Sequence, residues 1–159
     1  MRNVALRAPS TIEIEELTPD RNTIAAGRAM NNHLRIAIAD DDRVSRDFLL
    51  RMLLRMGHEV VCVAENGRQL ADYCLQSPPD LVITDVHMPQ LDGISAAAEI
   101  TLQHDVPIVL FSGCDLPAEI EQLDHVHVLV RRVKPIARSD LEAVLAEVLT
   151  LSDTFAAAS

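Results

Sequence analysis

Aromatic residues are scarce in this sequence: among 159 residues there is no tryptophan, one tyrosine and three phenylalanines. We therefore expect a core built mainly from aliphatic side chains and alanine. No apolar run approaches the roughly 18 residues that a membrane-spanning helix needs, so no membrane span is predicted. The first residues also lack the apolar stretch of a secretion signal, and we expect a cytoplasmic protein.

Positive charge is scarce as well. The formal net charge is −10 at pH 7, which argues against nucleic acid or an anionic membrane as a general partner. Lys134 is the only lysine among fourteen basic residues. Three cysteines (Cys62, Cys74 and Cys114) are odd in number and lack metal-ligand spacing, which predicts reduced thiols without a metal.

The length predicts one domain, preceded by an extension of different character. In residues 1–33 acidic and basic side chains balance, and turn-forming residues interrupt any periodicity. We expect a flexible extension there, a domain over residues 34–150 and a C-terminal tail over 151–159. Met30, shortly before the first strand, is a candidate for the natural start.

Apolar runs and helical patterns alternate along the rest of the chain. Strands are predicted at 34–39, 59–64, 81–84, 106–111 and 127–130, and helices at 44–56, 70–74, 94–103, 117–123 and 141–149. In the first helix Val44, Phe48, Met52, Leu53 and Met56 recur at helical spacing, and Gly57 follows as a stop signal. This alternation predicts an α/β fold, a doubly wound five-stranded parallel sheet with helices on both faces.

Polar residues follow the strands that this fold would align. Residues 40–42 are three aspartates after the first strand, Asp85 ends the third, Ser112 follows the fourth and Lys134 follows the fifth. The carboxyl ends of parallel strands share one edge, where carboxylates repel each other unless a divalent cation such as Mg²⁺ relieves the repulsion. A carboxylate can accept a phosphoryl group, whose oxygens a hydroxyl and an ammonium can bind. The pattern thus indicates a Mg²⁺-dependent aspartyl phosphate.

Each residue also has a structural interpretation. Asp42 is a good helix N-cap, and Asp85 could simply form a turn. Ser112-Gly113 could begin a loop, and Lys134 could be a solvated charge. The functional interpretation is favoured because all of them fall at strand ends on one edge, and no competing cluster occurs elsewhere in the sequence.

The chain resembles the receiver domain of two-component response regulators from about residue 34 to 149. The matching residues are Asp40-Asp41, Asp85, Met88-Pro89, Asp92-Gly93, Ser112 and Lys134-Pro135. The resemblance implies a flavodoxin-like (βα)5 fold. It also implies that Asp85 accepts a phosphoryl group from a sensor histidine kinase or a histidine phosphotransfer protein. At most, such a protein catalyses its own phosphorylation and dephosphorylation.

The resemblance also implies roles for the surrounding residues. Asp40, Asp41, Asp85 and the backbone carbonyl of His87 would hold Mg²⁺. Ser112 and Lys134 would bind phosphoryl oxygens. The Lys134-Pro135 bond is a candidate for the rare cis geometry.

Some positions depart from the family pattern. Arg131 stands where the family often has an aromatic switch residue. Two interpretations of Arg131 are open: it is a solvated surface charge, or its guanidinium group takes part in the switch and in the partner surface. His87 and Cys114 each lie two residues after a site residue, where the family tunes the lifetime of the phosphoryl group.

Only about 25 residues follow Lys134, so we expect a stand-alone receiver that signals through contact with a downstream protein. The output surface would be formed by residues 117–123, the fifth strand and the last helix. The kinase would dock near the first helix, where four arginines would surround the mouth of the site: Arg43, Arg46, Arg51 and Arg55. The oligomeric state is left open.

Two other functions remain open. The domain could be an interaction module that is never phosphorylated. Alternatively, Asp40-Asp41-Asp42 also fits the Asp-x-Asp start of haloacid-dehalogenase-type phosphatases, with Asp40 as the nucleophile and Asp42 as the general acid.

Overall fold

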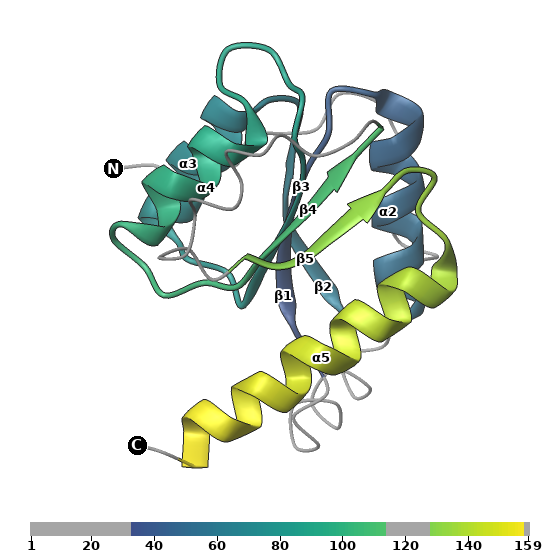
Figure 1. Ribbon diagram of the computed structural model, residues 1–159, viewed down its shortest axis with the longest axis vertical. Coiled ribbons are helices and arrows are strands. Elements are labelled where there is room, and N and C mark those ends of the chain that lie inside the picture. Colours follow the sequence, from purple (N-terminus) through teal and green to yellow (C-terminus); the bar gives the residue numbers. More distant parts are fainter. Residues whose placement is uncertain (1–32, 114–127, 158–159) are drawn as a thin grey trace.

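The computed structural model describes residues 33–113 and 128–157, with the backbone alone for 128–133 and 151–157. It contains one five-stranded parallel sheet in the order β2-β1-β3-β4-β5 (Figure 1). The strands are β1 Arg35–Ala39, β2 Glu59–Ala64, β3 Leu81–Asp85, β4 Ile108–Ser112 and β5 Val128–Val133. The helices are α2 Arg43–Arg55, α3 Gly67–Gln76, α4 Gly93–Thr101 and α5 Arg138–Ala157. The predicted helix at 117–123 and the extension before His33 lie outside the described residues.

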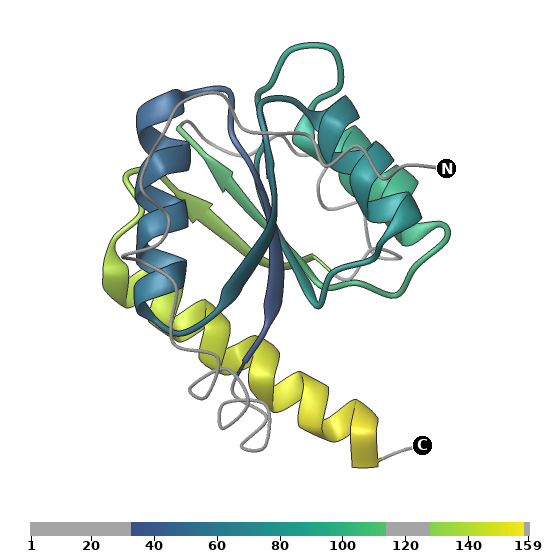
Figure 2. The same ribbon diagram turned by 180° about the vertical axis from the view of Figure 1, so that it is seen from behind.

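Helices cover both faces of the sheet, as predicted: α3 and α4 lie on one face, and α2 and α5 on the other (Figures 1 and 2). Alternate residues of β1 enter separate cores, Ala37 with α3 and α4, and Ile38 with α2 and α5. Burial on both faces explains why the strands read as continuous apolar runs. Among the described residues, no helix is both long enough and apolar enough to cross a membrane.

The predicted strands occur in the structure, with shifts at their ends. β2 has the predicted bounds, whereas β3 is longer by one residue and includes Asp85, and β5 extends to Val133. The last helix is also longer than predicted and runs over Arg138–Ala157. Apolar periodicity locates the buried middle of an element, but it carries little information on polar residues at the ends.

Local signals set both ends of α2. The Asp42 carboxylate caps the helix and accepts a hydrogen bond from the Ser45 N–H at 2.9 Å. At the other end Gly57 has a φ of 86°, and its N–H donates to the Leu54 carbonyl at 3.0 Å. The His58 N–H donates to the Leu53 carbonyl at 3.1 Å, which completes a Schellman-type end. The predicted stop at Gly57 is confirmed.

The face that α2 turns to the sheet differs in part from the prediction: Leu53 is in the core and Met52 and Met56 pack against it, but the other two predicted positions are exposed. Val44 and Phe48 are 75% and 41% exposed, whereas Leu49, Leu53 and Arg46 are buried. The spacing of Arg46, Leu49 and Leu53 defines the row that meets the sheet. α2 has more apolar positions than one face can hold, so periodicity alone did not identify this row.

Candidate functional site

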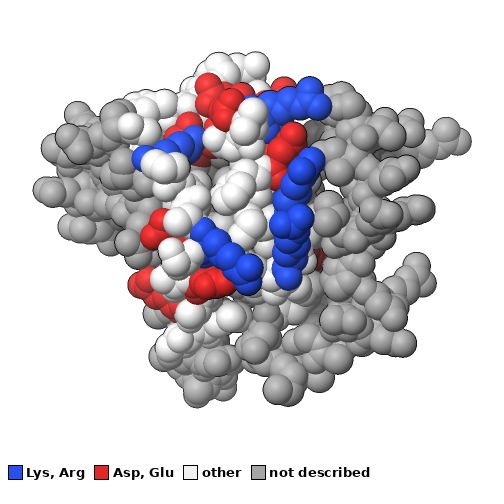
Figure 3. All heavy atoms as spheres, turned by 90° about the vertical axis from the view of Figure 1, so that its right-hand side faces the viewer, with Lys and Arg blue, Asp and Glu red and all other residues white. Residues whose placement is uncertain are grey.

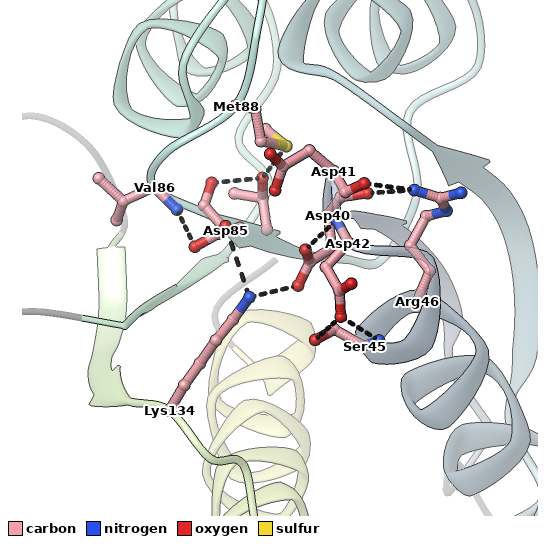
Figure 4. A network of polar contacts seen from close by, with 10 residues as sticks. Asp40, Asp41, Asp42, Ser45, Arg46, Asp85, Val86, Met88 and Lys134 are labelled. Atoms are coloured by element: carbon pink, nitrogen blue, oxygen red, sulfur yellow. Dashed lines mark hydrogen bonds and ion pairs between the residues drawn. The ribbon is translucent and has the colours of Figure 1, made fainter.

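The sheet brings the predicted strand-end residues together at its carboxyl edge (Figure 4). β1 and β3 are neighbours, with Ala39 paired to Thr84, so the next residues, Asp40 and Asp85, lie side by side. Lys134 directly follows β5 and reaches across to both carboxylates. Residues separated by up to 94 positions in the sequence therefore form one cluster.

Lys134 links the two buried carboxylates. Its Nζ lies 2.5 Å from Asp40 Oδ2 and 3.4 Å from Asp85 Oδ2. The backbone of the same residue is held by β4, because the Lys134 N–H donates to the Ser112 carbonyl at 2.7 Å. The ammonium group is thus directed at the two carboxylates.

Three carboxylates converge at the same place. One oxygen each from Asp40, Asp41 and Asp85 lies within 4.8 Å of the other two. Asp40 and Asp85 are buried, at 1% and 8% exposed, while Asp41 is exposed. A set of oxygen ligands open to solvent on one side fits Mg²⁺, which binds through a few carboxylates and keeps several waters. The cluster could therefore hold this ion.

Burial and charge perturb the ionisation of this site. Burial raises the pKa of Asp85, the Lys134 charge opposes the rise, and the neighbouring Asp40 carboxylate adds to it. For Lys134 burial disfavours the charge, but the hydrogen bond and charge of Asp40 outweigh burial and raise its pKa. The lysine stays protonated and partly neutralises two crowded carboxylates.

The backbone around Asp85 is held from several sides. Asp85 Oδ1 accepts a hydrogen bond from the Val86 N–H at 2.8 Å, and the Thr84 hydroxyl donates to the Asp85 carbonyl at 3.0 Å. The Gly93 N–H donates to the Val86 carbonyl at 2.8 Å. A Cβ built on Gly93 would lie 1.9 Å from the Asp85 carbonyl oxygen, so only glycine allows this approach. The Asp92-Gly93 pair predicted from the sequence thus supports Asp85 directly.

The other predicted site residues are placed as follows. Ser112 ends β4 and is fully buried. His87 lies in the loop after β3 with its side chain exposed. The Lys134-Pro135 peptide bond is cis, as expected from the resemblance. Arg131 lies in β5, but its side chain and the whole of Cys114 lie outside the described residues.

Asp42 has a structural role. Its carboxylate caps α2, and hydrogen bonds from the Ser45 backbone and side chain lower its pKa. Both hydrogen bonds hold the Asp42 carboxylate at the start of α2, so it is not positioned as the general acid of the phosphatase alternative. The geometry does not support that alternative.

Arg46 is the residue that the sequence analysis misjudged. It was expected to line the mouth of the site with Arg43, Arg51 and Arg55, but it is buried. One guanidinium nitrogen, NH1, donates to the Asp40 carbonyl at 2.7 Å and to the Asp41 carbonyl at 3.2 Å. The available signal was its position three residues before Leu49 on the row that faces the sheet.

Comparison with known proteins agrees with this geometry. The family model described as "Response regulator receiver domain" matches residues 36–146. The chain is 36% identical over 107 residues to the transcriptional regulatory protein PdtaR of Mycobacterium tuberculosis, covering 67% of this chain and 52% of PdtaR. It is 27% identical over 145 residues to the sensory/regulatory protein RpfC of Xanthomonas campestris, covering 88% of this chain and 20% of RpfC. The chain thus spans about half or less of these relatives.

Solved structures show the same fold. The receiver domain of the putative response regulator NarL from M. tuberculosis has a TM-score of 0.66 and 27% identity, covering 73% of this chain and 96% of that domain. The response regulator domain of Thermotoga maritima CheB has a TM-score of 0.65 and 21% identity, covering 74% and 96%. The matched residues span most of the chain and include the whole acidic and lysine cluster. The chain belongs to the receiver domain family of response regulators.

Proposed function

We propose that Asp85 accepts a phosphoryl group from a phosphohistidine of a sensor histidine kinase or a histidine phosphotransfer protein. One observation carries this proposal. Asp85 Oδ2 lies 3.4 Å from Lys134 Nζ, and Asp85 forms one cluster of carboxylates with Asp40 and Asp41. A buried nucleophile beside one cation and a potential metal site is the arrangement that phosphoryl transfer requires.

In the transfer, an Asp85 carboxylate oxygen bonds to phosphorus while the bond between phosphorus and the imidazole nitrogen breaks. The electron pair of that bond leaves with the imidazole. Lys134 donates hydrogen bonds to a phosphoryl oxygen, and Ser112 binds another. These contacts stabilise negative charge on the transferring group.

Asp40, Asp41, Asp85 and the backbone carbonyl of His87 would hold Mg²⁺ at this site. The donor set fits, since it offers oxygen atoms only and includes three clustered carboxylates. When bound, the ion would neutralise charge on the phosphoryl oxygens. His87 and Cys114, close in sequence to the site, would tune the lifetime of the phosphoryl group.

The donor protein would dock on the exposed face of α2. Val44 and Phe48 are the apolar part of this face, and Arg43, Arg51 and Arg55 are exposed on the same helix. Basic side chains lie among uncharged and acidic ones on this side of the molecule (Figure 3). An apolar patch with a basic rim fits a partner that presents apolar and acidic side chains.

We propose that the domain works in the cytoplasm, with output through contact between β5, α5 and a downstream protein. Arg131 would belong to this surface. Leu141, Val144, Leu145 and Val148 are in the core, so only the remaining side of α5 could meet a partner.

The first test is phosphorylation of the purified protein with acetyl phosphate and Mg²⁺, followed by intact mass measurement. We expect a base-labile gain of about 80 Da, one phosphoryl group, in the wild type and in the control Asp72→Asn, an exposed position on α3. Asp85→Asn should show no gain. If neither acetyl phosphate nor a phosphohistidine donor modifies the wild type, the proposal is wrong and an unphosphorylated interaction module is the better description.

A further inference from the structure

We propose that Arg46 is a positioning residue for the cation site. Its side chain holds the backbone of Asp40 and Asp41 so that their carboxylates face Asp85. This inference rests on the proposed use of these carboxylates to bind Mg²⁺. It assigns Arg46 to the site and not to the docking surface on α2.

The guanidinium group reaches three acceptors. NH1 donates to the Asp40 carbonyl at 2.7 Å and to the Asp41 carbonyl at 3.2 Å. NH2 lies 3.3 Å from Glu65 Oε1, just after β2. One side chain thus connects the start of the acidic loop with the end of the neighbouring strand.

Other contacts hold the same segment. The Asp40 N–H donates to the Ala64 carbonyl at 3.2 Å, and the Asp42 N–H donates to Asp40 Oδ1 at 2.8 Å. Neither contact holds the Asp40 or Asp41 carbonyl group. Arg46 binds both of these carbonyls.

Arg46 and Lys134 approach the acidic loop from opposite sides in the view of Figure 4. Lys134 contacts the Asp40 carboxylate, while Arg46 contacts the backbone carbonyls. Because Arg46 is bound to carbonyl oxygens, it does not occupy the carboxylate oxygens of Asp40 and Asp41. The loop is therefore anchored without loss of metal ligands.

The chemistry requires arginine. A guanidinium group offers five N–H donors in a fixed plane, so it can bind two carbonyls and a carboxylate together. An ammonium is a point charge that cannot hold this planar set of acceptors. The Arg46 side chain is 11% exposed, which suits an internal anchor and leaves little of it for a docking partner.

The test is a titration with Mg²⁺ alone, followed by ¹⁵N NMR spectra that report both folding and binding. Arg46→Gln and Arg46→Lys are compared with wild type and with Arg35→Gln, an arginine at the start of β1, at the opposite end of that strand from Asp40. Loss of groups that orient metal ligands commonly weakens metal binding by 10–100-fold. We expect Arg46→Gln to weaken Mg²⁺ binding by about tenfold or more and Arg46→Lys by at least about threefold. The control Arg35→Gln should match wild type.

The titration separates positioning from a general contribution to stability. A purely structural role would lower the urea midpoint but leave the Mg²⁺ affinity of the folded protein unchanged. Should Arg46→Gln not fold, Arg46→Lys decides. If the folded Arg46 variants bind Mg²⁺ with an affinity within twofold of wild type, the inference is wrong but the proposed function still stands. If wild type itself binds no Mg²⁺, the inference and the metal part of the proposed function both fail.

Discussion

Gly93→Ala probes the close packing of α4 against the segment that presents Asp85. The added Cβ would lie 1.9 Å from the Asp85 carbonyl oxygen and 2.9 Å from its carbonyl carbon, where ordinary contact begins at 3.4 Å. Both atoms belong to the backbone, so no side-chain rotation relieves the overlap. The start of α4 must move away by about 1.5 Å, or the end of β3 must shift.

The expected cost follows from what this movement breaks. It strains the hydrogen bond of 2.8 Å from the Gly93 N–H to the Val86 carbonyl, and it disturbs the adjacent cap that Asp92 forms with Ser95. Overpacking costs about 1–3 kcal/mol and a lost buried hydrogen bond about 1 kcal/mol more. The helix preference for alanine offsets less than about 1 kcal/mol of this. We expect the free energy of unfolding to fall by about 2–3 kcal/mol.

The assay is urea unfolding followed by circular dichroism, since the protein lacks tryptophan. Gly113→Ala is the matched control, because a Cβ there meets nothing within 4 Å, and we expect a change within about 0.5 kcal/mol. The folded Gly93→Ala protein should also be phosphorylated more slowly, because Asp85 is displaced. Equal stability of the two variants, with phosphorylation of Gly93→Ala at the wild-type rate, would refute the reasoning.

Two further predictions concern groups away from the site, the buried His58 and Cys74 and the half-buried Cys62. Burial and the nearby His33 lower the pKa of His58 from its ordinary 6.5. Below about pH 6.5 the unfolded chain therefore binds a proton that the folded protein does not bind. The free energy of unfolding then falls as the pH falls, by at most about 1.4 kcal/mol per pH unit. In His58→Asn the amide oxygen can still accept the hydrogen bond from the Leu34 N–H. We expect the urea midpoint of this variant to depend less on pH than that of wild type. An unchanged pH profile would show that His58 is not the group responsible. Burial raises the pKa of Cys62 to about 11 and that of Cys74 to about 12. Iodoacetamide at pH 8 should therefore label both far faster in urea than in the native protein, as peptide mass spectrometry would measure; equal rates would contradict their burial.

Much of the fold and site was predictable because their signals are local or follow from topology. The order of apolar runs and helical patterns specifies a parallel sheet, and a parallel sheet brings the ends of its strands to one edge. Asp40, Asp85 and Lys134 could therefore be assigned to one site before their contacts were known. The stop of α2 at Gly57 was equally local, since a left-handed residue there suits glycine.

The orientation of α2 was not predictable from its own residues. Val44 and Phe48 are as apolar as many core residues, and Arg46 is charged, yet Arg46 is buried and the other two are exposed. The energy of burying Arg46 is recovered from carbonyls that lie beside it only in the folded chain. Periodicity within one helix contains no information about such acceptors.

The sequence by itself determined the parallel sheet and which carboxylates and lysine meet at its carboxyl edge. The tertiary structure alone decided that Lys134 binds Asp40 more closely than Asp85, that Arg46 anchors the acidic loop and that Gly93 touches the Asp85 backbone. Lys134 reaches Asp40 across 94 positions of the sequence, whereas Arg46 and Gly93 contact residues only five to eight positions away. Their distances depend on how strands and helices pack, and packing is a property of the whole domain.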